Sequence, residues 1–255
     1  APTLVVSDEN AAKQVSHVEN LRMLKRKKHE LGDILLVDQK HAVSMTYYRN
    51  NILHLTALPA LVACCFPQGA MHDRPAVRNM IACIYPFFRR EFFLQWRVEN
   101  IDKEVDSLLD WLSGQKLLDF DEQSGNFLHA AENAGSPQLQ LLANVISPTL
   151  ELYYLMIVML RDSREKKISR DDIEKKSFLV AQRVAMIHEL NSPDFSDKHL
   201  IANFLTQLEK NRCIRLRDDD GIECSGDFSL VEKNLSLLLS PQARSAILQT
   251  AKTQS

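Results

Sequence analysis

Polar and aromatic side chains of the kinds that bind ligands or partners are concentrated in residues 46–54, TYYRNNILH. Arg49 carries a planar guanidinium whose forked donors suit a phosphate or a carboxylate. If the stretch is helical, Asn50 and His54 lie four residues apart on one face, where their side chains can converge. Two interpretations stay open: a buried polar network that orients packed helices, or an interface or ligand contact. The candidate contact residues are Tyr47, Tyr48, Arg49, Asn50, Asn51 and His54.

Several catalytic and phosphate-binding patterns are excluded because an essential residue is missing. A zinc-protease helix needs His-Glu-x-x-His, whereas the two His-Glu pairs of this chain end in Asp33 and Ser192. Two late glycines have P-loop spacing, but Asp227 follows them where lysine is needed, and its carboxylate would repel phosphate. Only 7 of 255 residues are glycine, and none of them form a dinucleotide fingerprint. We therefore predict no metal site and no cofactor.

The composition indicates a helical chain with a packed core and no strong electrostatic preference. A net charge of −2 over 255 residues gives no general attraction to nucleic acid or to an anionic membrane. Five cysteines without zinc-type spacing predict reduced, buried thiols. Residues 50–72 contain no Asp, Glu, Lys or Arg, but polar residues and prolines interrupt them. We expect no transmembrane helix in this chain and see no signal-peptide pattern.

Apolar residues that recur every three or four positions predict long helices. Pro59 is expected to kink or divide the first of them, because proline removes a helical hydrogen bond. Ser147–Pro148 should break another, and Ser169 is a suitable N-cap for the last, which should stop at Asn191–Pro193. The expected helices cover residues 43–63, 75–97, 139–160 and 169–191.

A shorter pattern of helix, strand, tight turn and strand occurs three times, in residues 8–37, 101–129 and 197–224. Ser-Gly and Asp-Gly in the second and third copies suit hairpin turns. The expected fold class is mainly α, a multi-helix bundle with short β-hairpin, winged-helix-like insertions. The expected parts are an N-terminal helix plus wing (1–40), a helical unit with a hairpin (41–135), and a second helical unit with a hairpin and a C-terminal helix (136–255).

Helix-plus-hairpin modules raise an alternative function, because winged variants of the helix-turn-helix bind DNA. Residues 22–28 include a basic cluster that would give salt-sensitive binding. The second and third hairpins instead carry acidic residues, including Asp218–Asp220, which would repel phosphates. A winged-helix module for nucleic acid or protein is the alternative, and a free-standing enzyme with an unrecognised site is a third possibility.

The polar stretch also carries a family resemblance. Met45–Asn51, followed by His54 and Leu58–Pro59, resembles the C-terminal region of bacterial membrane-associated glycerol-3-phosphate 1-O-acyltransferases. Further similar segments follow in the family's order and extend the resemblance over nearly the whole chain. These segments are Gly32–Leu36, Tyr85–Pro86, Glu91–Trp96, Glu174–Ser177, Val180–Arg183, His188, Pro193–Phe195 and Asp197–Lys198.

The resemblance implies a role in phospholipid biosynthesis, on the cytoplasmic side of the inner membrane. The family transfers an acyl chain from acyl-acyl carrier protein or acyl-coenzyme A to glycerol 3-phosphate. Its general base lies in a His-x-x-x-x-Asp motif, but none of the 8 histidines here has Asp five positions later. The resemblance thus implies the non-catalytic C-terminal region, inactive alone and without catalytic residues. Its expected partners are an upstream catalytic domain and a membrane surface, and no nucleic acid.

Overall fold

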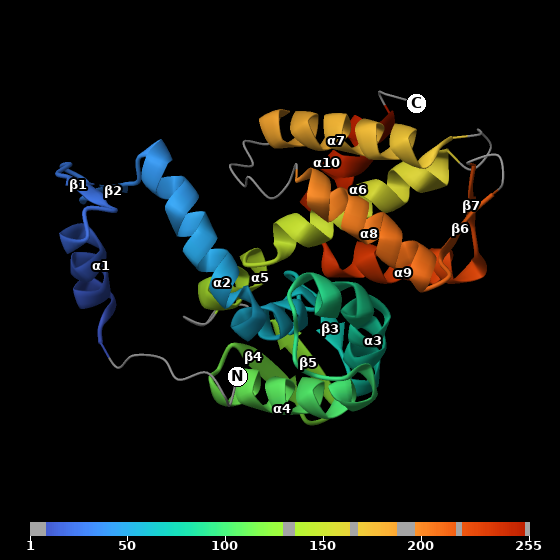
Figure 1. The fold of residues 1–255 in the computed structure, drawn as a ribbon. Coiled ribbons are helices and arrows are strands. Elements are labelled where there is room, and N and C mark those ends of the chain that lie inside the picture. Colours follow the sequence, from blue (N-terminus) through green and yellow to red (C-terminus); the bar gives the residue numbers. More distant parts are fainter. Residues whose placement is uncertain (1–8, 130–135, 164–167, 188–196, 218–220, 253–255) are drawn as a thin grey trace. The chain divides into compact units, whose positions relative to one another are not determined.

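A computed structural model describes residues 9–129, 136–163, 168–187, 197–217 and 221–252 (Figure 1). Within these ranges the chain is mainly helical, with short antiparallel hairpins, which confirms the predicted fold class. The helices are α1 (Ala11–Asn20), α2 (Gln39–Cys64), α3 (Arg74–Glu91), the 3-10 helix η1 (Val98–Asn100), α4 (Ile101–Gly114), α5 (Ser136–Asn144), α6 (Ser147–Asp162), α7 (Arg170–Ile187), α8 (Lys198–Lys210), α9 (Gly226–Leu238) and α10 (Pro241–Lys252). The strands are β1 (Lys25–Lys27), β2 (Ile34–Leu36), β3 (Met71–His72), β4 (Leu118–Asp121), β5 (Asn126–His129), β6 (Ile214–Leu216) and β7 (Ile222–Cys224).

The chain divides into two compact units, Ala1–Leu55 and Thr56–Ser255, and the boundary falls inside α2. The first unit contains α1, the antiparallel β1–β2 hairpin and the beginning of α2. The second contains the other elements, including a three-stranded sheet in the order β3-β5-β4 and the β6–β7 hairpin. Each unit is described by itself.

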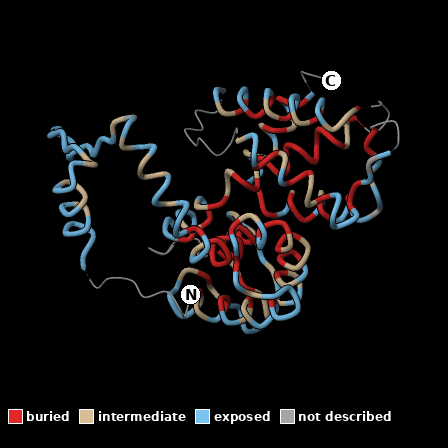
Figure 2. Tube along the Cα trace, viewed as in Figure 1, coloured by how far each residue is buried: buried red, intermediate tan, exposed pale blue. Residues whose placement is uncertain are grey.

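The core of the second unit lies around α6, which packs against α7, α8, α9 and α10 (Figure 2). Residues 152–160 of α6 are buried without interruption, so this helix has no solvent face along that stretch. The Tyr153 ring stacks on Phe204 of α8 with centroids 3.9 Å apart, and Phe88 of α3 meets Tyr153 edge-on. Among the described residues no single helix is both long and apolar enough to cross a bilayer; α5 and α6 reach that length only as a pair bent by 58°.

The three predicted helix-and-hairpin units are present as α1–β1–β2, α4–β4–β5 and α8–β6–β7. Each helix ends in the same way, with a basic residue in the left-handed region: Arg22, Lys116 and Arg212 have φ of 59°, 58° and 59°. In α4 the Leu117 N–H then donates to the Leu112 carbonyl at 2.9 Å, as in a Schellman cap. The equivalent bond closes the other two helices at 3.2 and 2.8 Å. The common cap turns the chain from helix into strand.

One helix ends earlier than its apolar pattern predicts. We expected a helix over 75–97, but α3 stops at Glu91. Phe93 adopts a left-handed φ of 52°, and the Leu94 N–H donates back to the Arg89 carbonyl at 3.0 Å. Leu94 is nevertheless buried, so the apolar pattern continues beyond the helix that it was taken to mark.

The other predicted breaks have mixed outcomes. The helix was expected to kink or divide at Pro59, and the structure does not divide it, because α2 continues to Cys64. Residues 57–66 are buried, and their packing offsets the hydrogen bond that proline removes. Ser147–Pro148 does begin a new helix, and the Ser169 hydroxyl caps α7 by accepting from the Asp172 N–H at 3.2 Å. The predicted stop at 191–193, the acidic run 218–220 and the similar segments at 188 and 193–195 lie outside the described residues.

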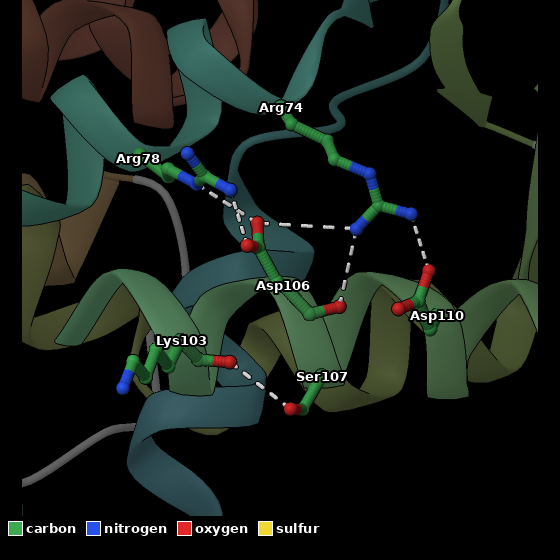
Figure 3. Close-up of polar contacts among 6 residues, drawn as sticks. All are labelled: Arg74, Arg78, Lys103, Asp106, Ser107 and Asp110. Carbon is green, nitrogen blue, oxygen red and sulfur yellow. Dashed lines mark hydrogen bonds and ion pairs between the residues drawn. The ribbon is translucent and has the colours of Figure 1, made fainter. Parts of the chain in front are cut away.

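An arginine–aspartate network joins α3 to α4 (Figure 3). Arg78 pairs with the Asp106 carboxylate, its Nε donating to Oδ1 at 2.9 Å. Arg74 pairs with Asp110, donates to the Asp106 backbone carbonyl at 3.4 Å, and lies 4.9 Å from the Phe127 ring centroid. Acidic residues of the second helix-and-hairpin unit are thus used to hold two helices together.

Candidate functional site

The candidate contact residues lie on the part of α2 that belongs to the first unit, and most of them are exposed. Tyr47 and Tyr48 keep 65% and 57% of their surface exposed. Asn50, Asn51 and His54 are also exposed, and Arg49 is partly covered. In this chain they form a surface and are not packed into a buried polar network.

The side chains of this surface are ordered by contacts with their neighbours. The rings of Tyr47 and Tyr48 meet edge-on, with centroids 5.8 Å apart. The Arg49 Nε and Nη2 atoms donate to the Asn50 Oδ1 atom at 3.2 and 3.0 Å. The structure therefore brings Arg49 and Asn50 together. Asn50 and His54 are one helical turn apart, as predicted, but the amide oxygen of Asn50 is engaged by Arg49.

Large apolar side chains accompany these polar residues on the same part of α2. At 100° per residue, the exposed apolar positions fall within one half of the helix circumference. Leu53 points to the other half and is 8% exposed, the one buried residue among 9–55 whose side chains the structure describes. We call the exposed half the α2 face; its residues are Val43, Tyr47, Tyr48, Ile52 and Leu55.

The hairpin of the first unit is exposed in the same manner (Figure 2). All three residues of β2 are exposed on both sides of the strand, and so is Val37 after it. Since one buried leucine supplies almost no core, the first unit cannot owe its stability to its own interior. Its apolar surface is larger than scattered exposed residues would explain.

Two of the five basic residues in the cluster of residues 22–28 pair with carboxylates inside the first unit. Arg26 donates through Nε to Glu19 at 2.8 Å and through Nη1 to Asp33 at 3.3 Å. Lys25 pairs with Asp38 at 3.4 Å. Charges already paired with carboxylates are less able to bind phosphates, so Lys25 and Arg26 contribute less to the nucleic-acid alternative than the sequence suggests.

A cavity of about 110 Å³ in the second unit brings together groups that sequence reasoning could not connect. Cys64, His129, Ser147 and Glu151 line it, although they come from α2, β5 and α6. Burial raises the pKa of the Glu151 carboxyl to about 7 and that of the Cys64 thiol to about 12. His129 is buried, and its Nδ1 atom has no hydrogen-bond partner among the described residues.

The cavity is not arranged for nucleophilic catalysis. The Ser147 hydroxyl donates to the Ala143 carbonyl at 3.0 Å, and the Cys64 thiol to the same oxygen at 3.6 Å. Both potential nucleophiles are therefore bonded to a backbone oxygen rather than to a base, and a thiol with so high a pKa is a poor nucleophile. Among the described residues, no three His, Cys, Asp or Glu side chains are grouped to hold a metal ion.

Comparison with known proteins places this chain in a family. A family model described as the glycerol-3-phosphate acyltransferase C-terminal region matches residues 1–217. The glycerol-3-phosphate acyltransferase of Pseudomonas fluorescens strain SBW25 is 32% identical over 253 residues, covering 98% of this chain and 30% of the relative. That of Ectopseudomonas mendocina strain ymp is 34% identical over 221 residues, covering 87% and 26%. The chain thus spans less than a third of the length of these curated relatives.

Proposed function

This chain belongs to the family of the glycerol-3-phosphate acyltransferase C-terminal region, and we propose that it is the non-catalytic part of an enzyme that acylates glycerol 3-phosphate. The acyl donor is acyl-acyl carrier protein or acyl-coenzyme A. Two observations support the proposal that the chain is the non-catalytic part. The relatives extend far beyond the chain, and no histidine of the chain is followed by Asp at the fifth position. The chemistry then lies in the remaining part of the polypeptide, and the chain alone is inactive.

The observation that carries a specific role is the α2 face. The first unit buries a single described side chain, Leu53, yet exposes an apolar half-helix and an apolar hairpin. Such a unit gains stability when it packs against another surface. In this family the rest of the acyltransferase polypeptide is the natural partner. We infer that the first unit docks on the catalytic domain and supports it.

The residue types of the α2 face suit such a contact. Tyrosine buries a large area at a small cost in conformational entropy, and Tyr47 and Tyr48 are neighbours on the helix. Arg49, Asn50 and His54 lie beside them and supply donors and acceptors for a polar rim. The tyrosines are therefore the anchors, and the polar residues set the register of docking. The product of the proposed reaction is a lipid, so the enzyme would work at the cytoplasmic surface of the inner membrane.

The test compares variants of the full-length protein in an acyl-transfer assay. Replacing both Tyr47 and Tyr48 with alanine should lower the rate of acyl transfer by roughly tenfold or more, the scale of losing an interface hot spot. Arg49→Ala should give a smaller loss in the same direction. Leu141→Ala, at an exposed apolar position of α5, is the matched control and should leave the rate unchanged.

Two results would contradict the proposal in distinguishable ways. If the unmodified full-length protein transfers no acyl group to glycerol 3-phosphate, the proposed activity is wrong. If the tyrosine variant retains the activity and expression level of the Leu141→Ala control, the enzyme stands but the docking role of the α2 face is wrong.

A further inference from the structure

Phe93, just after α3, is an aromatic side chain held out in solvent, with 88% of its surface exposed. Its backbone lies in the left-handed region at φ 52°, where the Leu94 N–H bonds back to the Arg89 carbonyl. Glycine is the usual residue at this position of a helix cap, because a bulky side chain is strained there. Phe93 thus combines a strained backbone conformation with an aromatic ring that is exposed to solvent.

The other helix ends of this chain show what the position usually requires. Arg22, Lys116 and Arg212 occupy the same left-handed position after α1, α4 and α8, and all three are long cationic chains suited to water. Phe93 has no polar group that gains from exposure, whereas moving its ring into an apolar environment is favourable. The internal comparison indicates that the ring is presented for a contact.

Three arginines lie within four positions of Phe93 in the sequence. Arg89 and Arg90 are exposed in the last turn of α3, and Arg97 is exposed before η1. Arg89 and Arg97 line a common hollow of about 490 Å³. Among the described residues, none of the three arginines forms an ion pair. Cations near a helix C-terminus interact well with the helix dipole, which accounts for two of the arginines but not for Arg97 or the exposed ring.

The nearby carboxylates leave this surface positively charged. Glu99 lines the hollow with the arginines and offsets one of them. Glu91 instead accepts from the Asn203 amide at 3.3 Å, and burial raises its pKa. Within residues 89–100, the exposed charged side chains are thus three arginines and one glutamate.

We propose that Phe93, Arg89, Arg90 and Arg97 together contact the surface of a bilayer that contains anionic phospholipid. The Phe93 ring enters the boundary between head groups and acyl chains, and the arginines pair with lipid phosphates. We call these four residues the Phe93 surface. The inference rests on the proposed function, because an enzyme that makes lipid needs a defined orientation on the membrane.

A bilayer fits this surface better than an acidic protein does. A specific protein interface needs an apolar core within roughly 800 Å² on each partner. The Phe93 surface offers one exposed ring and three arginines close to it in the sequence, which is too little for such a core. At a bilayer, by contrast, one inserted aromatic residue and a few basic residues are a sufficient contact.

The test measures co-sedimentation of the full-length protein with vesicles of phosphatidylcholine, with and without phosphatidylglycerol, at low and high salt. The wild type should bind the anionic vesicles more strongly, and salt should weaken this binding. Phe93→Gly should lower the partition coefficient about tenfold on both vesicles, since it removes a buried ring. Arg89→Gln should lower it roughly fivefold on anionic vesicles and little on neutral ones.

Substitutions at Phe93 also test whether a loss of binding comes from a loss of folding. Glycine relieves the left-handed strain, so Phe93→Gly should keep or raise the melting temperature while it weakens binding. Phe93→Trp should restore binding, because tryptophan favours the membrane interface. Leu230→Ala, at an exposed position of α9, should leave vesicle binding unchanged.

The result that overturns the inference is vesicle binding by Phe93→Gly equal to that of the wild type. If that variant kept its vesicle binding but lost acyl transfer, the surface would contact a protein and the inference would also be wrong. Acyl transfer assayed in detergent micelles separates this inference from the proposed function. Loss of vesicle binding with intact activity in micelles supports the Phe93 surface, whereas a wild type inactive in micelles counts against the proposed function alone.

Discussion

Glu151 on α6 shows how one partly buried residue sets a measurable property of the second unit. Its carboxyl lines the small cavity, and burial is the cause that raises its pKa to about 7, from an ordinary value of 4.5. A carboxylate that is partly removed from water and has no cationic partner among the described residues is unfavourable, so the folded protein holds the proton to a higher pH than the unfolded chain does. Sequence could not predict this, because Cys64, His129 and Glu151 meet in the cavity only through the tertiary fold.

The sign of the pH dependence follows from this shift. Between about pH 4.5 and pH 7 the folded state binds more protons than the unfolded state, so the contribution of Glu151 to stability falls as pH rises. The loss is of the order of 3 kcal/mol, at about 1.4 kcal/mol for each pKa unit. Glu151→Gln should therefore raise the free energy of unfolding above pH 7 and have little effect below pH 4.5. Urea unfolding of both proteins at the two pH extremes measures this, and an equal difference at both would contradict it.

At the scale of elements, much of the structure could be predicted from the sequence. Helical periodicity located the long helices, and turn dipeptides located two of the three hairpins. The end of α3 could not be predicted, because Phe92 and Leu94 remain buried after the helix has stopped. Strand β3 has two residues and owes its conformation to pairing with β5, more than 50 positions later, so no local pattern marks it.

The positions of the helix ends were also difficult to predict, because the chain contains few glycines. With 7 glycines in 255 residues, the chain caps α1, α4 and α8 with left-handed arginine or lysine residues. These caps are formed by backbone bonds that other residue types can also make, at a cost in strain. The sequence signal of a helix end, glycine after the last turn, is therefore missing at all three.

Lys116 allows this strain to be measured at an exposed cap. Lys116→Gly should raise the free energy of unfolding by up to about 1 kcal/mol, because glycine adopts a left-handed φ without penalty. The matched control is the adjacent exposed residue Gln115, whose φ is −83°. There glycine only increases the entropy of the unfolded chain, so Gln115→Gly should lower stability by roughly 0.5–1 kcal/mol. Urea unfolding measures both, and changes of the same sign would show that the cap is not strained.

At the scale of the whole molecule, the two units differ in how their apolar residues are used. The second unit buries its apolar residues around α6, as helical periodicity predicts. The first unit has a comparable periodic pattern along α2, yet Val43, Tyr47, Tyr48 and Ile52 are exposed. Periodicity predicts which residues seek burial but not which surface covers them. The polar stretch could therefore be located from sequence, whereas its exposure could be seen only in the structure.

Docking of the first unit should be visible as protection of its backbone amides in the full-length protein. A segment with almost no core of its own is protected from hydrogen exchange only while a partner covers it. The Tyr47→Ala/Tyr48→Ala variant should exchange faster than the wild type in α1, the β1–β2 hairpin and residues 39–55. Each 1.4 kcal/mol of lost docking energy gives about a tenfold increase in rate. Amides of α6 lie in the core of the second unit and should be unchanged, which provides an internal control. Equal exchange of the first unit in both proteins would mean that the α2 face is not its docking surface, whereas faster exchange of α6 as well would indicate general unfolding in place of undocking.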